Sequence, residues 1–276
     1  MRVLVSVDME GIAGVVGWDD TVPGRPDYER ARRLMTSEAN AAVRGVLAFD
    51  SEAEVLVADG HALYRNLLPE ALDRRARLLR GRPRADGMLA GLDQDVDAVL
   101  LIGYHGRAGS WRSVLAHTMN GLVIFDVRCE GRSLGEIGLN VALAAARGST
   151  VVLVTGDDTA AKEAKEVAPG IHAVEVKRAV GGWAADTLHP DEACGRIEAA
   201  VGPALEERTA IRPLRFDGPT ELEIDLVRPV MIEPLLLVPG LERAGARTLR
   251  YRGESFEAAY RIVELVAMFA PAELRL

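Results

Sequence analysis

Cysteine, aromatic residues and long apolar runs are all scarce in this sequence. Its 276 residues include only two cysteines, Cys129 and Cys194, which lie far apart and form no CxxC motif. This usage favours a reducing compartment with structural thiols and argues against a disulfide-stapled fold. No apolar run approaches the roughly 18 to 20 residues that cross a bilayer, and the N-terminal MRVLVSV is too short for a signal peptide. We therefore expect a cytoplasmic protein with no membrane partner.

Positive charge is also in short supply. Lys and Arg total 33 against 41 Asp and Glu, which gives a formal net charge of −8. This balance argues against nucleic acid or an anionic membrane as a partner held by bulk electrostatics. One basic cluster exists, RRARLLRGRPR at residues 74–84, but no aromatic residues interleave it for base stacking. We interpret this cluster as a solvated helix face that continues into a loop.

Hydrophobic residues make up 49% of the chain, enough for a substantial core, and they fall in short runs separated by helical patterns. The runs are RVLVSV, EVLVAD, DAVLLIGYH, GLVIFDVRCEG and TVVLVTG, with helices expected near residues 28–49, 134–146 and 158–168. Strands that alternate with helices predict an α/β fold, in which a largely parallel sheet is flanked by helices.

The alternation weakens from about residue 169 onward. A helix is expected near residues 190–207, strands at TELEIDLV and TLRYRG, and a C-terminal helix at 255–269. We therefore predict two parts, an α/β part over residues 1–168 and a smaller C-terminal α+β part over residues 169–276.

Polar side chains gather where the expected parallel strands end. Asp8 and Glu10 follow RVLVSV, His61 follows EVLVAD, and His105 ends DAVLLIGYH. Functional groups of parallel α/β sheets collect at the carboxyl ends of the strands. Asp8 and Glu10 are two residues apart, so in an extended segment both carboxylates lie on one side and repel each other. A divalent cation would remove this repulsion, and the mixed imidazole and carboxylate set suits zinc, with manganese and cobalt as competitors.

Other acidic residues near these positions have simpler explanations beside a functional one. Glu136 is a further candidate ligand, although an acid is also favoured in the first turn of the helix that GEIGLN opens. One of Asp157 and Asp158 is expected to cap the helix that follows. Asp59 could orient the ring of His61 as a hydrogen-bond partner behind it, and we do not expect it to bind a metal.

A glycine-rich loop, YHGRAGSWRSVLAHTMNG, adds a third histidine, His117. Together with VSVDMEGIAG, ADGH, LGEIGLN and TGDDTAAKEA, all within the first 165 residues, this loop resembles the D-aminopeptidase family of zinc peptidases. Each motif alone is weak, but the set in this order is specific.

The resemblance implies an aminopeptidase that uses metal-activated water to hydrolyse short peptides with N-terminal D-amino acids, such as D-Ala-D-Ala. It also implies two Zn²⁺ per subunit, held by Asp8, Glu10, His61, His105 and Glu136, with His117 as the catalytic residue. Asp8 is the favoured bridging ligand, and His117 would either protonate the leaving amine or stabilise the oxyanion.

The same resemblance implies a quaternary structure. The family's typical assembly is a homo-oligomer, a decamer of two stacked pentameric rings. For the two predicted parts, we expect residues 1–168 to form the metal-binding catalytic part and residues 169–276 to serve assembly or substrate gating.

Two alternatives remain open. A magnesium-dependent phosphohydrolase of the haloacid dehalogenase type would use Asp8 as a phosphorylated nucleophile, since DMEG and TGDD resemble its acidic motifs. That class has an aspartate where Glu10 stands and a threonine where Ile12 stands, and it leaves the histidines unused. A non-enzymatic, receiver-like metal-binding module would use Asp59 as its phosphoacceptor, but it leaves His105, His117 and the C-terminal part unexplained.

Overall fold

A seven-stranded sheet, here called sheet A, carries most of the chain. The computed structural model describes residues 1–92 and 95–269. Sheet A has the order β3-β2-β1-β4-β7-β8-β9, and all its pairings are parallel except that of β8 with β9. Its strands are β1 (Arg2–Val7), β2 (Glu54–Asp59), β3 (Ala76–Leu79), β4 (Ala98–Tyr104), β7 (Val151–Asp157), β8 (His172–Gly181) and β9 (Ala184–Thr187). The predicted α/β class, with a largely parallel sheet, is confirmed.

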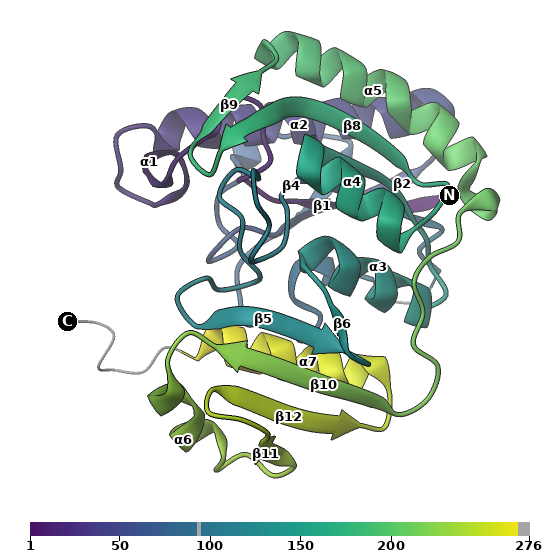
Figure 1. Cartoon of the computed structure of the whole chain (residues 1–276). Coiled ribbons are helices and arrows are strands. Elements are labelled where there is room, and N and C mark those ends of the chain that lie inside the picture. Colours follow the sequence, from purple (N-terminus) through teal and green to yellow (C-terminus); the bar gives the residue numbers. More distant parts are fainter. Residues whose placement is uncertain (93–94, 270–276) are drawn as a thin grey trace.

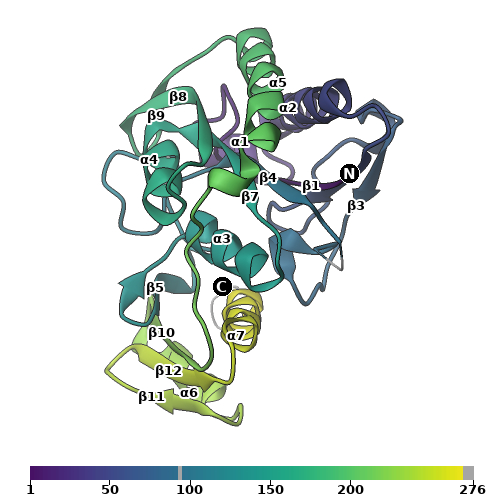
Figure 2. The same cartoon turned by 90° about the vertical axis from the view of Figure 1, so that its right-hand side faces the viewer.

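Helices cover both faces of sheet A. The long helices α2 (Tyr28–Phe49) and α5 (Pro190–Glu206) lie side by side on one face, and α3 (Glu136–Ala146) and α4 (Asp158–Val167) lie on the other (Figures 1 and 2). This double cover explains why β4 and β7 are buried at every position, because a central parallel strand has no solvent face. A short helix, α1 (Trp18–Thr21), follows β1.

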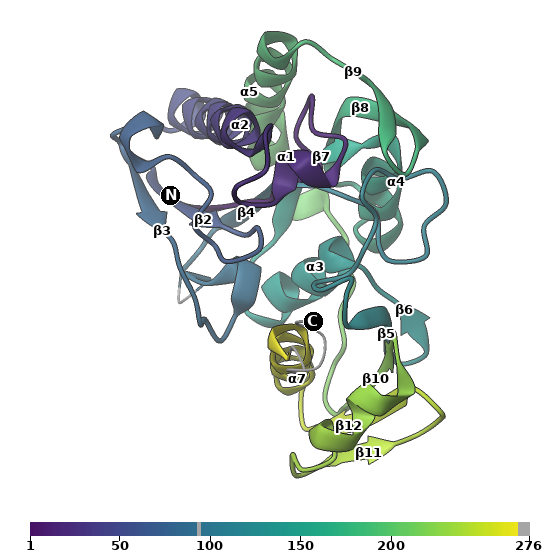
Figure 3. The same ribbon diagram turned by 90° about the vertical axis from the view of Figure 1, so that its left-hand side faces the viewer.

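A second, antiparallel sheet, sheet B, has the order β11-β12-β10-β5-β6. Its strands are β5 (Ile124–Cys129), β6 (Arg132–Ser133), β10 (Thr220–Leu226), β11 (Leu241–Arg243) and β12 (Thr248–Gly253). The C-terminal helix α7 (Phe256–Met268) packs between this sheet and α3 (Figure 3). Short helical turns complete the fold: η1 (Pro69–Ala71), η2 (Gly87–Leu89), η3 (Arg208–Ala210), η4 (Pro229–Met231) and α6 (Ile232–Leu235).

The two sheets do not follow the expected boundary between residues 168 and 169. Strands β8 and β9 and helix α5, which lie after it, complete sheet A, whereas β5 and β6, which lie before it, pair into sheet B. The basic cluster at residues 74–84 also differs from expectation, because its first half forms strand β3 at the edge of sheet A instead of a helix face. Among the described residues, no helix combines the length and apolar character that crossing a membrane requires.

The ends of β1, β2 and β4 place the polar residues together. Val7 is level with Asp59 in the β1–β2 pair and with Ile102 in the β1–β4 pair, so the segments that follow these strands emerge at one edge of sheet A. Gly11 permits the close approach of two of them, because a Cβ there would overlap the main-chain carbonyl oxygen of Tyr104.

Candidate metal centre

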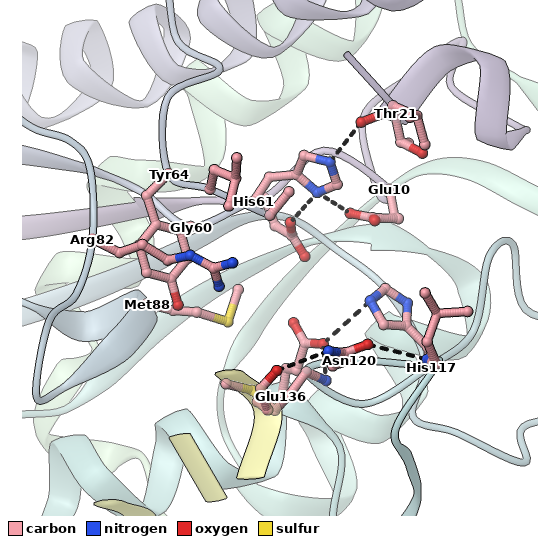
Figure 4. A pocket seen from close by; sticks show the side chains of 18 of the residues that line it. Glu10, Thr21, Gly60, His61, Tyr64, Arg82, Met88, His117, Asn120 and Glu136 are labelled. Atoms are coloured by element: carbon pink, nitrogen blue, oxygen red, sulfur yellow. Dashed lines mark hydrogen bonds and ion pairs between the residues drawn. The ribbon is translucent and has the colours of Figure 1, made fainter. Parts of the chain in front are cut away.

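Five of the sequence-predicted site residues come together in a buried cluster. Asp8 and Glu10 follow β1, His61 follows β2, His105 follows β4, and Glu136 begins α3. Each of these residues is buried, with exposed fractions between 1% and 7%. Their convergence from four separate segments was the expectation from the strand ends, and Figure 4 shows three of them, Glu10, His61 and Glu136, around one cavity.

Asp8 lies between the two halves of the cluster. Its Oδ1 is 3.4 Å from His61 Nδ1, and its Oδ2 is 3.4 Å from His105 Nε2. On the first side, Glu10 Oε2 is 2.9 Å from His61 Nδ1. On the second side, Glu136 Oε1 is 3.5 Å from His105 Nε2. A carboxylate that offers one oxygen to each side has the arrangement of a ligand shared by two ions.

The third histidine, His117, lies against the second half of the cluster. Its ring stacks on that of His105, with centroids 4.3 Å apart, and its Nε2 is 3.7 Å from Glu136 Oε1. The ligand atoms of His105, His117 and Glu136 fall within 4.8 Å of one another, and so do those of Asp8, Glu10 and His105. Two overlapping sets of groups that could bind a metal are therefore present.

Each histidine uses one ring nitrogen for a main-chain carbonyl and turns the other toward the acids. His61 Nε2 is 2.9 Å from the oxygen of Thr21, His105 Nδ1 is 3.0 Å from that of Gly106, and His117 Nδ1 is 2.8 Å from that of Leu115. A carbonyl accepts only from an N–H, so these contacts fix the proton on the outer nitrogen. In the neutral ring the inner nitrogen then carries a free lone pair, and this is the form of histidine that binds a metal.

The buried carboxylates of the cluster are stabilised by positive charge close to them. Burial alone would raise the pKa of Asp8, but the neighbouring imidazoles of His105 and His61, which are positively charged when protonated, hold it well below its usual range. Burial would lower the pKa of both histidines, yet Glu10 beside His61 and Glu136 beside His105 raise it well above the usual value. A divalent cation can replace these protons as the charge that holds the carboxylates together.

One atom tests directly whether these residues fit a metal ion. His105 Nε2 is fully buried and makes no hydrogen bond within the described part of the chain, although it faces two carboxylates. Buried polar atoms without partners are rare because they cost free energy, and an unpartnered imidazole nitrogen among carboxylates is explained by a metal ligand. The donor set of nitrogen and oxygen atoms therefore fits zinc or a related ion.

The acidic residues around the cluster have structural roles. Asp157 caps α4 by accepting from Ala160 N, as expected for one of the aspartate pair, and it also accepts from Ser113 Oγ and Val114 N in the loop before His117. Asp59 makes no hydrogen bond to the ring of His61, whose two nitrogens face Glu10 and Thr21. It accepts from the main-chain N–H groups of Asn66 and Leu67, which fixes the turn after His61 instead.

Two buried residues that sequence reasoning missed support the segment from Glu10 to Val15. Lys177 on β8 donates from Nζ to the carbonyl oxygens of Glu10, Ile12 and Val15 at 2.5, 2.9 and 2.6 Å. Glu38 on α2 accepts from the N–H of Ala13 at 2.8 Å. The neighbouring residues in the sequence do not indicate that Lys177 or Glu38 is buried in this way, because a lysine in a strand or a glutamate in a helix is usually solvated.

A cavity of about 540 Å³ opens onto the cluster. Polar residues of the centre form one side, and apolar residues contribute much of the remainder, including Trp18, Val22, Leu63, Leu122 and Met268. This volume lies within the range of sites for small ligands. A buried set of imidazoles and carboxylates at the strand ends of an α/β sheet, open to such a cavity, defines a candidate metal-dependent enzyme.

Comparison with known proteins gives the family. The D-aminopeptidase family model matches residues 1–265. A curated D-aminopeptidase from Bacillus subtilis (strain 168) is 35% identical over 277 residues, which covers 98% of each chain. The chain therefore belongs to the D-aminopeptidase family.

A solved structure agrees with this assignment. It is the Zn-dependent D-aminopeptidase DppA from Bacillus subtilis, described as a self-compartmentalizing protease. It superposes with a TM-score of 0.92 at 33% identity, over 98% of this chain and 99% of that one. These matches give no support to the phosphohydrolase or receiver-like alternatives, in both of which the histidines that surround Asp8 would be idle.

Proposed function

We propose that this protein is a zinc-dependent aminopeptidase that hydrolyses short peptides with an N-terminal D-amino acid, such as D-Ala-D-Ala. Family membership supports the peptidase activity, and the zinc-dependent relative supports the metal. The single observation that carries the site is the position of Asp8, with one carboxylate oxygen toward His61 and the other toward His105.

We propose that two zinc ions are held by Asp8, Glu10, His61, His105 and Glu136. When bound, such ions lower the pKa of a water molecule and polarise a carbonyl group. The protein's own part is to supply three buried carboxylates and two imidazoles with their lone pairs turned inward. The surrounding apolar side chains exclude bulk water, which strengthens the electrostatic interactions of the centre.

His117 is proposed as the catalytic residue. Its Nδ1 is held by the carbonyl of Leu115, so Nε2 is the atom free to act on a molecule in the cavity that it lines. Nε2 can take up a proton and pass it to the leaving amine or, once protonated, donate a hydrogen bond to the oxyanion. Its 16% side-chain exposure, against 1% for His105, fits a residue that meets substrate.

A homo-oligomer is also proposed, with the decamer of two stacked pentameric rings as its form. The relative described as self-compartmentalizing supports assembly. Large apolar side chains are available for contacts between copies, since Trp111, Trp183 and Leu237 are 86%, 71% and 85% exposed. This proposal includes a role in assembly or substrate gating for residues 169–276.

We also propose a cytoplasmic location, which the two free cysteines support.

Metal analysis and stereochemistry test the proposal together. Elemental analysis is expected to find about two zinc equivalents per chain, and His105→Ala is expected to lose them. D-Ala-D-Ala should be cleaved and L-Ala-L-Ala should not. His117→Ala should keep its zinc and lose about 100-fold or more in turnover. A metal-free chain with full peptidase activity would refute the site, and an assembly mass far from ten times 29.7 kDa would refute the decamer.

A further inference from the structure

The cavity beside the metal centre is lined by an arginine, Arg82, to which the proposed metal site gives no role. Its charged lining is mostly acidic, with Asp8, Glu10 and Glu136 in the centre and Glu264 from α7. Arg82 carries the only guanidinium or ammonium group among the described residues that line this cavity. It lies on the segment between β3 and η2, and Figure 4 shows its guanidinium extending into the cavity, on the side away from His117.

Arg82 is not used by the fold. Within residues 1–92 and 95–269, its side chain makes no hydrogen bond, ion pair or aromatic contact, and it is exposed. Its neighbour Arg84 is less exposed and makes both an aromatic contact and a hydrogen bond. The guanidinium of Arg84 packs on the ring of Tyr64 at 3.9 Å and donates to the carbonyl of Asp59. One arginine of the pair therefore supports the segment, while the other leaves its donors to the cavity.

The charges of a short peptide substrate match this arrangement. Such a peptide has an ammonium group at one end and a carboxylate at the other. The proposed function places the N-terminal residue and its scissile carbonyl at the metal centre, so the carboxylate at the other end of the peptide lies further along the cavity and needs a cation there. A guanidinium suits it because its planar N–H groups can donate two parallel hydrogen bonds to one carboxylate.

We propose that Arg82 binds the C-terminal carboxylate of the substrate and thereby selects peptides short enough to reach from the metal centre to this arginine. This inference rests on the proposed peptidase function and adds a residue that determines substrate length. Glu264 also lines the cavity and interacts electrostatically with Arg82, but it does not cancel the attraction: burial raises the pKa of its carboxyl to about 7, although the charges of Arg84 and Arg82 lower it, so the group is partly protonated at neutral pH.

Two substrates that differ only in this carboxylate test the inference. The zinc-loaded protein and its Arg82→Met variant are assayed with D-Ala-D-Ala and with D-Ala-D-alaninamide, which lacks the negative charge. Methionine keeps much of the length of the side chain and removes the charge. Arg77→Met is the matched control, because Arg77 is exposed on β3 and does not line the cavity.

The expected result is a change in KM for one substrate only. Arg82→Met should raise KM for D-Ala-D-Ala at least tenfold, the scale of one charge-assisted pair, with kcat within about twofold. Both constants should stay unchanged for the amide, and Arg77→Met should behave as the parent protein. Arg82→Lys should recover part of the lost affinity.

Other outcomes separate the inference from the function on which it rests. An equal loss for acid and amide, or a fall in kcat for both, would overturn the proposed role, because Arg82 would then act on a group that both substrates share. Unchanged constants in Arg82→Met would overturn it as well, with the peptidase intact. If the parent protein cleaves neither peptide, the peptidase function fails and this inference fails with it.

Discussion

Glu38 gives a quantitative test of the electrostatics behind the centre. It lies in the middle of α2 with 2% exposure, its Oε1 accepts from Ala13 N, and its Oε2 has no partner among the described residues. Burial raises the pKa of its carboxyl from 4.5 to about 7, although the hydrogen bond from Ala13 and the charge of Lys177 act in the opposite direction. The folded protein therefore favours the neutral form.

The sign of the effect on stability follows from this raised pKa. The contribution of Glu38 is fully present below pH 4.5, where both states are protonated, and it is lost as pH rises through about 7. At 1.36 kcal/mol per pKa unit, the difference between 4.5 and about 7 costs the folded state about 3 kcal/mol above pH 7. At pH 5 the same linkage gives about 1 kcal/mol.

Glu38→Gln removes this cost and keeps the acceptor for Ala13 N. We expect the variant to be more stable than the parent by about 3 kcal/mol at pH 8 and by about 1 kcal/mol at pH 5. Urea denaturation of chelator-treated protein between pH 5 and pH 8 measures the difference. Glu206→Gln, at an exposed position on α5, controls for the removal of one negative charge. A difference that stays constant over this pH range, or a variant less stable at pH 8, would refute the reasoning.

Three further substitutions probe how the segments around the centre are held. Gly11→Ala would push a Cβ into the carbonyl of Tyr104, the last residue of β4. We therefore expect the free energy of unfolding to fall by about 3 kcal/mol, and zinc binding, measured by chelator competition, to weaken. Gly17→Ala is the control, because a Cβ there meets open space. Lys177→Met leaves three buried carbonyls without a donor and should cost about 3 kcal/mol in urea denaturation, whereas an unchanged midpoint would contradict those contacts. Asp59→Asn keeps one oxygen for the main-chain N–H groups of the turn after β2 but turns its own NH2 group toward the side-chain NH2 of Asn66, and should cost about 2 kcal/mol. If zinc affinity and stability both stay at the parent's values, that turn is not held as described.

The sequence predicted the strands of sheet A and the meeting of their polar ends because both follow from local patterns. Runs such as AVLLIGY are apolar at every position, as a parallel strand with two covered faces must be. In a parallel sheet, the residues that follow neighbouring strands lie close together at one edge of the sheet. Asp8, Glu10, His61 and His105 could therefore be placed together without knowledge of any distance.

The remaining features depend on contacts that no local pattern records. IFDVRC was grouped with the parallel strands, yet from Phe125 onward it alternates apolar and polar residues, and β5 indeed has a partly exposed face in antiparallel sheet B. That alternation was a usable signal. Lys177 and Arg82 offered none, because whether a cation is buried under a loop or turned into a cavity is decided by segments distant in sequence.

The composition of sheet B has a consequence for the order in which the protein can form during synthesis. Strand β5 pairs with β6 and with β10, and β10 begins at Thr220, far along the chain from Cys129 at the end of β5. At the roughly 5 to 20 residues per second of translation, β5 must wait on the order of 5 to 20 seconds for that partner to be made. Glu136 follows directly after β5 and β6, so this acidic residue at the cavity adjoins a sheet that stays incomplete until about four-fifths of the chain has been synthesised.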